Sequence, residues 1–169
     1  DVRNFDAWDA FIRAYWGFFR FTRDDNATAQ NLLQKAIELT PNLAQYHGLL
    51  AVTHLMDALY GWSDSRDVSL SLALERAERG IALDDNNSLA IRAIGATHFF
   101  SKNHDVALSY YRKAVQVNPN EAENRALLGG ALGVRPIPGK PRRRPRSSSA
   151  ARLRDGFAYR PGFLELGDH

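Results

Sequence analysis

The order of apolar and polar residues repeats along the first 134 residues of the chain. Residues 29–42 read AQNLLQKAIELTPN, and residues 107–120 read ALSYYRKAVQVNPN. Both segments run from a small residue through leucines or aromatic residues to Lys-Ala, and both finish at Pro-Asn. Residues 73–86, ALERAERGIALDDN, follow the same pattern with Asp85 in place of the proline. Because proline stops a helix, each segment predicts a helix that ends where the chain turns.

A second repeated pattern precedes each of these helices. LAVTHLM at 50–56 and IGATHFF at 94–100 carry a Thr-His pair in the same apolar frame. A large residue followed by a small one recurs at 16–17, 50–51, 94–95 and 128–129 (Trp-Gly, Leu-Ala, Ile-Gly and Leu-Gly). Small residues at such places let two helices approach closely. The pattern therefore predicts helices that pack in pairs.

These helix pairs resemble the tetratricopeptide repeat, a helix-turn-helix unit of about 34 residues. The resemblance covers roughly residues 10–133, with units near 10–43, 44–87 and 88–121 and a partial unit at 122–133. The positions that match the second-helix signature are Ala29, Leu33, Ala36 and Pro41, then Ala73, Ala77, Gly80 and Asp85, then Ala107, Tyr111, Ala114 and Pro119. The resemblance implies an all-α solenoid of helical hairpins in a right-handed superhelix.

The second unit is longer than its neighbours. It holds 44 residues, and the excess lies in DALYGWSDSR at 57–66. We expect a loop between the paired helices there, with Ser65 or Asp67 capping the helix that follows. Tyr60 and Trp62 in this insertion are candidates for a contact with a partner, and covering the edge of a repeat is the alternative.

The resemblance also implies a concave surface lined by the first helix of each unit. The residues it places there are mainly apolar: Phe11, Phe18, Phe21, Val52, Leu55, Met56, Arg92, Phe99 and Phe100. Such a groove would suit an amphipathic helix or an extended apolar peptide, with Arg92 placed to hold a carboxylate or a backbone carbonyl. The alternative is that the aromatic residues are core, as apolar residues at helical spacing usually are.

Some members of the family clamp a C-terminal carboxylate with Lys and Asn side chains in the groove. The corresponding positions here are Ala14, Phe18, Leu49, Leu89 and Ala93. We do not expect that mode of binding.

The charge of the chain divides at about residue 134. Residues 1–134 hold 13 Lys and Arg against 16 Asp and Glu, whereas residues 135–169 hold 9 against 3. We expect 134–169, rich in Pro and Arg, to be an irregular tail that is disordered or arises from a frameshift, because it occupies the place of the fourth unit's second helix. The alternative function is nucleic-acid binding through the basic run Lys140, Arg142, Arg143, Arg144 and Arg146, which we do not favour.

Catalytic or metal chemistry has little support in the sequence. The chain has no cysteine, so thiolate sites are excluded. His54 and His98 occupy equivalent positions, but a metal site needs three or four converging ligands, and packed histidines are expected instead. GVRPIPGKP at 133–141 lacks the spacing and the Ser or Thr of a phosphate-binding loop. We expect no enzyme activity, cofactor or metal.

The functional prediction is protein–protein interaction by a piece of a larger protein. FTRDDNATAQNLLQKAIELTPN at 21–42 and YHGLLAVTHLMDALYGW at 46–62 resemble repeat regions of bacterial cyclase-linked or winged-helix regulator-linked signalling proteins. The resemblance implies a cytoplasmic scaffold with a protein or peptide partner and no membrane association. Self-association could also follow from the last helix, where Leu127, Leu128 and Leu132 would lack a covering helix.

Overall fold

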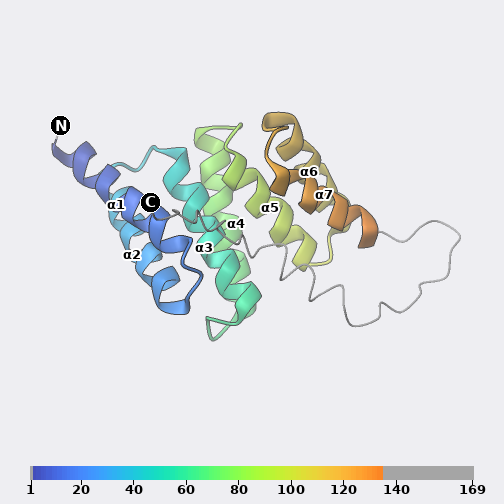
Figure 1. The fold of residues 1–169 in the computed structure, drawn as a ribbon, viewed down its shortest axis with the longest axis horizontal. Helices are drawn as coiled ribbons and strands as arrows, with labels where there is room; N and C mark the ends of the chain where they lie inside the picture. Colours follow the sequence, from blue (N-terminus) through green and yellow to red (C-terminus); the bar gives the residue numbers. More distant parts are fainter. Residues whose placement is uncertain (1, 135–169) are drawn as a thin grey trace, which may run out of the picture. The chain divides into compact units, whose positions relative to one another are not determined.

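The computed structural model describes residues 2–134 of the chain, and the predictions made above for residues 135–169 lie outside them. Within the described part, seven α-helices follow one another (Figure 1): α1 (Val2–Phe18), α2 (Arg23–Leu39), α3 (Ala44–Tyr60), α4 (Arg66–Leu83), α5 (Ser88–Phe100), α6 (His104–Val117) and α7 (Ala122–Val134). The predicted all-α fold is confirmed, and none of the described residues forms a β-strand.

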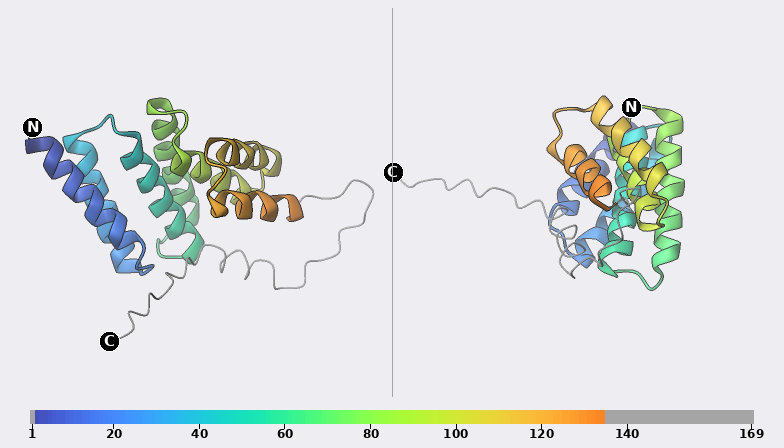
Figure 2. Two further views of the ribbon diagram at one scale, coloured as in Figure 1. Left: turned by 45° about the horizontal axis from the view of Figure 1, so that its top comes forward. Right: turned by 90° about the vertical axis from the view of Figure 1, so that its right-hand side faces the viewer.

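The helices pack as successive hairpins, α1 with α2, α3 with α4 and α5 with α6. The second helix of each hairpin also packs on the next first helix, and α3 packs on α5. Figure 2 shows the hairpins stacked side by side, with α7 beside the α5–α6 hairpin. No helix among the described residues is long and apolar enough to cross a bilayer.

The repeated small residues are the places where the helices meet. Ala29, Leu33 and Ala36 of α2 are buried, and so are the corresponding signature residues of α4 and α6. Gly80 leaves little room for a larger side chain, because a Cβ atom there would lie 3.0 Å from the Cβ atom of Ala90. The small residue at this position of the repeat therefore allows α4 to pack closely against α5.

Side-chain caps fix the starts of three helices. Ser65 begins α4, and its hydroxyl accepts a hydrogen bond from the Val68 amide, whereas Asp67 lies in the first turn. Thr22 caps α2 in the same way, and Asn87 caps α5 through the Ala90 amide. Each cap satisfies an amide that has no partner within the helix.

The first helix begins earlier than the predicted unit. The sequence suggested a start near residue 10, whereas α1 already begins at Val2. No glycine or proline occurs before Gly17, and Ala7 and Ala10 are buried in the core. The additional turns of α1 therefore meet no helix breaker, and they contribute to packing.

Candidate protein-docking face

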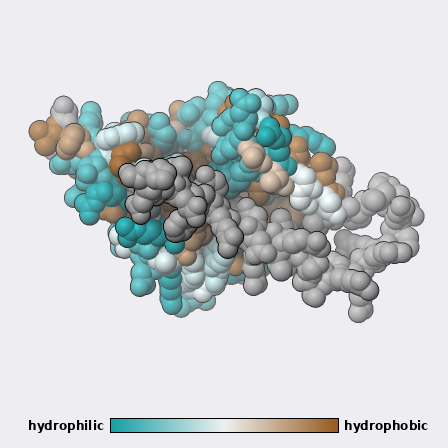
Figure 3. Space-filling model, viewed as in Figure 1, coloured by the Kyte–Doolittle hydropathy of each residue, from teal (hydrophilic) through white to brown (hydrophobic). Residues whose placement is uncertain are grey.

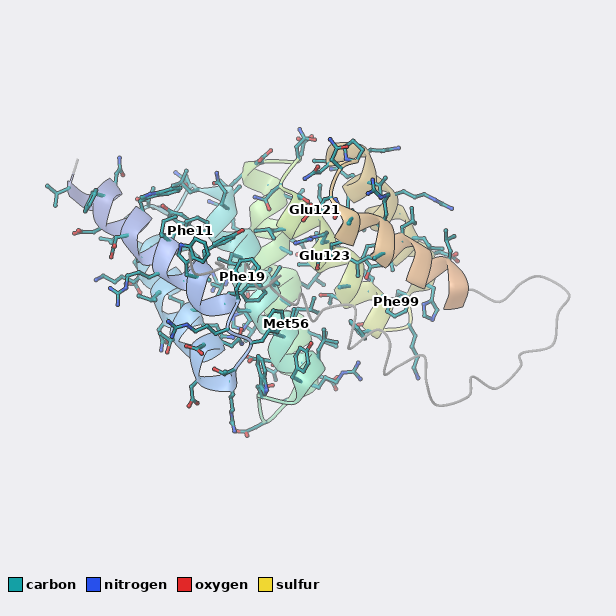
Figure 4. The ribbon with its side chains drawn as sticks, in the orientation of Figure 1. Phe11, Phe19, Met56, Phe99, Glu121 and Glu123 are labelled. Carbon is teal, nitrogen blue, oxygen red and sulfur yellow. The ribbon has the colours of Figure 1, made fainter. Side chains whose placement is uncertain are left out.

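The first helices of the hairpins, together with α7, form one side of the described part, which we call the odd-helix face. Figure 4 shows Phe11, Phe19, Met56, Phe99 and Glu123 along this side. They come from α1, the turn after it, α3, α5 and α7. The predicted groove residues therefore belong to a common side, but they differ in how far they are exposed.

Aromatic rings follow one another without interruption along α1 and the turn after it. We call them the aromatic strip: Trp8, Phe11, Tyr15, Phe19, Phe18 and Phe21. Consecutive ring centroids in that order lie 5.5, 6.2, 4.9, 5.4 and 5.7 Å apart. Such distances are typical of interacting aromatic pairs. The rings therefore stabilise one another as a continuous surface.

One ring of the aromatic strip is buried against α3, and several others are exposed. Phe11 is buried, and its ring lies 5.0 Å from that of Tyr46 on α3. Trp8 keeps 52% of its surface exposed, Tyr15 37% and Phe19 36%. Phe18 and Phe21 are half-buried, so the strip is partly core and partly available for contact. Trp8, Tyr15 and Phe19 were not among the predicted site residues, although their spacing with Phe11 follows the helical period.

The turn after α1 holds Phe21 in a left-handed backbone conformation, with φ of 55°. A non-glycine residue rarely adopts this conformation. The Phe21 amide donates to the carbonyl of Phe18, and the Phe18 and Phe21 rings are in contact. The ring contact and the turn thus hold the end of the aromatic strip in place.

The predicted groove residues of α3 are core instead. Val52, Leu55 and Met56 are 8%, 2% and 2% exposed, so the prediction that they line an open groove is wrong for this structure. The physical reason is that α2, α4 and α5 all pack against α3. The sequence pattern could not reveal this, because an apolar stripe has the same period in a core as in a groove.

Arg92 was expected to hold a carboxylate, and the carboxylates it holds come from its own chain. Its side chain is 11% exposed and lies 2.8 Å from the Glu121 carboxylate, and it also pairs with Glu123. Ser88 and Asn118 donate to the second oxygen of Glu121. Arg92 therefore joins α5 to the start of α7, and the expectation that it awaits a partner's carboxylate is corrected.

Phe99 and Phe100 end α5 as a half-buried pair, with ring centroids 5.5 Å apart. Phe99 also contacts the His104 ring at 5.3 Å. The guanidinium of Arg66 lies 5.9 Å from the centre of the Phe100 ring, within the range of a cation–π interaction. Phe100 therefore already contacts α4, and Phe99 is the better candidate for a contact with a partner.

The loop predicted at 57–66 is shorter in the structure, because α3 continues to Tyr60 and α4 begins at Arg66. Tyr60 and Trp62 stack with centroids 5.0 Å apart and 22° between their planes, and both are half-buried. Gly61 ends α3 in the left-handed conformation, and its amide and that of Trp62 both donate to the Asp57 carbonyl. The insertion is thus attached to the end of α3 rather than extended from it.

The two repeated histidines lie in different surroundings. His54 is buried, and burial lowers its pKa, although the nearby Asp57 carboxylate acts in the opposite direction. The His98 ring stacks on Tyr110 at 6.2 Å. Between residues 2 and 134, no group of three or more histidine, aspartate or glutamate side chains is arranged to hold a metal ion.

The positions of the family's carboxylate clamp carry no cation. Ala14, Leu49 and Ala93 are buried, and Phe18 and Leu89 are half-buried. The acidic side chains of Glu121 and Glu123 lie on the same face, 29% and 41% exposed. The face is therefore apolar at its α1 end and acidic at its α7 end.

Comparison with solved structures gives the class to which this fold belongs. The tetratricopeptide-repeat domain of Arabidopsis OM64 matches with a TM-score of 0.64 at 14% identity, over 79% of this chain and 99% of that one. The corresponding domain of Sgt2 from Aspergillus fumigatus matches with a TM-score of 0.60 at 16% identity, over 84% and 92%. The chain thus has the tetratricopeptide-repeat fold.

A third structure of this fold was solved with a peptide. The second tetratricopeptide-repeat domain of human RPAP3, in complex with the HSP70 peptide SGPTIEEVD, matches with a TM-score of 0.56 at 15% identity, over 75% of this chain and 98% of that one. No family model matches the sequence, and no curated protein matches it. The likeness therefore concerns the fold.

Proposed function

We propose that this chain is a non-catalytic docking module that binds a protein or peptide partner on the odd-helix face. The observation that carries the proposal is the aromatic strip, in which Trp8, Tyr15 and Phe19 expose between 36% and 52% of their surface while Phe11 anchors them to α3. Partly exposed aromatic rings on a rigid support are frequent anchors in protein interfaces.

The charges of the face restrict the partner's chemistry. A peptide ending in several carboxylates, such as the one bound to human RPAP3, would meet Glu121 and Glu123, and Arg92 is already paired with both. We therefore propose an amphipathic helical or extended apolar segment whose charged residues are neutral overall or basic. Like charges brought together at an interface would disfavour the acidic alternative.

The wider context of the proposal is a scaffold segment of a larger bacterial signalling protein in the cytoplasm. That context is supported by the sequence resemblance of residues 21–62 to repeat regions of such proteins, and not by the fold.

The test measures binding of a set of amphipathic peptides, basic and acidic, to the full chain by fluorescence anisotropy. Tyr15→Ser and Phe99→Ser should each weaken the best basic or neutral peptide by roughly 30-fold, the equivalent of about 2 kcal/mol for an interface anchor. Val68→Ser is the matched control, because Val68 is 57% exposed on α4, outside the odd-helix face. Equal losses in all three variants, or a preference for acidic peptides, would contradict the proposal.

A further inference from the structure

The helices α1 and α5 end in the same arrangement of two aromatic rings. Phe18 is the last residue of α1 and Phe19 follows it, whereas Phe99 and Phe100 are the last two residues of α5. The ring centroids lie 5.4 Å apart in the first pair and 5.5 Å apart in the second, with 74° and 88° between the ring planes. We call these two groups the α1 pair and the α5 pair.

The turn behind each pair also has the same backbone. The Phe21 amide donates to the Phe18 carbonyl at 3.3 Å, and the Lys102 amide donates to the Phe99 carbonyl at 3.1 Å. Phe21 and Lys102 are the two non-glycine residues with a positive φ in the described part of the chain, at 55° and 66°. Such a conformation persists where the surrounding contacts hold it. Each pair is therefore held on a defined turn.

Each pair offers one ring for a contact with a partner. Phe19 keeps 36% of its surface exposed, and Phe99 is half-buried, whereas Phe100 lies against the Arg66 guanidinium. Figure 4 shows Phe19 and Phe99 on the odd-helix face with Met56 of α3 between them. The two pairs are therefore separate contact points on either side of α3.

The separation of the pairs follows from helix packing. Packed helices lie about 8–10 Å apart, so α1 and α5, which both contact α3, lie roughly 16–20 Å apart. A partner helix rises 1.5 Å per residue, so about eleven residues span ~17 Å, and the side chains at the two ends of that span point within about 20° of each other. An extended segment would cover the same distance in about five or six residues.

The surface between the pairs favours the helix over the extended segment. The α3 residues predicted for this face are apolar: Val52, Leu55 and Met56. The Asp57 carboxylate already accepts hydrogen bonds from two side chains of α2. An extended segment would bring its backbone N–H and C=O groups to these apolar side chains, where they would lack hydrogen-bond partners. A helix satisfies its backbone internally and presents only side chains.

The charges around the pairs indicate which helix would fit. Residues 19–25, 61–67 and 101–105, at the hairpin turns, hold four Lys and Arg against five Asp, so they are nearly balanced. On α7, Glu121 and Glu123 share the single Arg92, which leaves one negative charge. Where the described residues are visible in Figure 3, hydrophobic and hydrophilic patches alternate. A helix that is apolar along one side and carries a basic residue on the flank nearer α7 is complementary to this face.

We infer that the odd-helix face receives an amphipathic helix of a partner protein, with two large apolar side chains about eleven residues apart, one on the α1 pair and one on the α5 pair. The inference rests on the proposed docking function. It narrows the partner from a helical or extended segment to a helix of defined spacing.

The first experiment measures the binding of three fluorescent peptides to the full chain by anisotropy. Each peptide has about 18 residues, mainly alanine and lysine, which is long enough to form a helix. The first carries two leucines about eleven residues apart. The second has the same composition with the leucines about nine residues apart, which places them on opposite sides of a helix. The third is the first with a central proline, which breaks the helix.

We expect the first peptide to bind on the order of 10-fold more tightly than either of the others, because only it presents both leucines on one side of a helix. If the second or the third peptide binds as tightly as the first, the inference is wrong and the docking function stands. If none of the three binds, the docking function fails and the inference fails with it.

The second experiment assigns each leucine to a pair by combining Phe19→Ser or Phe99→Ser with peptides in which one leucine is replaced by alanine. Each replacement should weaken binding to the parent chain about 10-fold. One leucine should cease to matter in Phe19→Ser and the other in Phe99→Ser, because a side chain that has lost its partner ring contributes little. Val68→Ser on α4 is the control, and circular dichroism should show the same helix content in all variants. If both substitutions act on the same leucine, the two pairs do not hold opposite ends of the helix and the inference is refuted.

Discussion

Gly95 and Gly129 are equivalent positions in the repeat pattern, 34 residues apart, but the structure gives them different surroundings. A Cβ atom at Gly95 would lie 2.8 and 2.9 Å from two ring carbons of Tyr111 and 3.3 Å from the Cβ atom of Tyr110. A Cβ atom at Gly129 would meet nothing within 4 Å. Substituting alanine at each position therefore isolates the effect of helix packing.

Two effects of opposite sign act at Gly95. Alanine is favoured over glycine in a helix by about 0.5–1 kcal/mol. Tyr111 is only 2% exposed, so its ring cannot move aside easily, and overpacking of a core costs about 1–3 kcal/mol. We expect Gly95→Ala to lower the free energy of unfolding by about 1 kcal/mol. Gly129→Ala should raise it by about 0.5–1 kcal/mol, because only the helix preference acts there.

Urea unfolding followed by circular dichroism at 222 nm measures both changes. The contrast between the two variants, about 1–3 kcal/mol, is the decisive quantity, because the helix preference is common to both and cancels. Hydrogen exchange would locate the change in α5 and α6 for the first variant and in α7 for the second. If Gly129→Ala destabilised the chain as much as Gly95→Ala, a further helix would have to pack on α7, and the reasoning would fail.

Three other predictions follow from the contacts of α7 and from the buried histidines. Asn124→Ala should lower the free energy of unfolding by about 1–3 kcal/mol, because the buried side-chain amide of Asn124 donates to the carbonyls of Ala114 at 3.0 Å and Asn118 at 3.1 Å. Urea unfolding measures the change, with Asn120→Ala at an exposed position as the control. Equal effects of the two substitutions would show that these hydrogen bonds do not stabilise the chain. Arg92→Leu should destabilise α7 by about 1.5–3 kcal/mol through loss of its hydrogen bonds to Glu121 and Glu123; exchange rates in α7 that match the parent chain would contradict this. Burial lowers the pKa of both His47 and His54 below the usual 6.5. Near and below pH 6.5 the unfolded chain therefore binds protons that the folded chain does not. Stability should fall as the pH drops below about 6.5. His54→Phe should reduce this pH dependence of the urea midpoint, and an unchanged slope would argue against it.

The hairpins could be predicted from the sequence because their determinants are local. Ala73, Ala77 and Gly80 recur at the helical spacing that buries one side of a helix, and Pro119 ends a helix where it stands. Ser65 could be proposed as a cap because its serine hydroxyl stands directly before the helix. Such features depend only on residues a few positions apart in the sequence. Because the same pattern recurs from unit to unit, it can be recognised more easily than in a single unit.

The exposure of individual side chains was decided only by the tertiary structure. Val52 and Met56 have the spacing of a groove, yet they are buried, because α2, α4 and α5 surround α3. Trp16 has the spacing of a packed residue, yet it is 67% exposed. Periodicity shows that an apolar side exists on a helix, but it does not show what covers that side.

Arg92 also shows the difference between what the sequence predicts and what the tertiary structure decides. Its type and position suggested that it would hold a partner's carboxylate or backbone carbonyl, whereas the structure pairs it within its own chain. Its carboxylates, Glu121 and Glu123, are 29 and 31 residues further along the chain, and they meet Arg92 only when α7 packs on α6. The sequence by itself therefore determined the helices and their pairing, through local spacing and caps. The stacking of one hairpin on the next decided which residues are core, which are paired and which are open to a partner, because those contacts join segments that are distant in the chain.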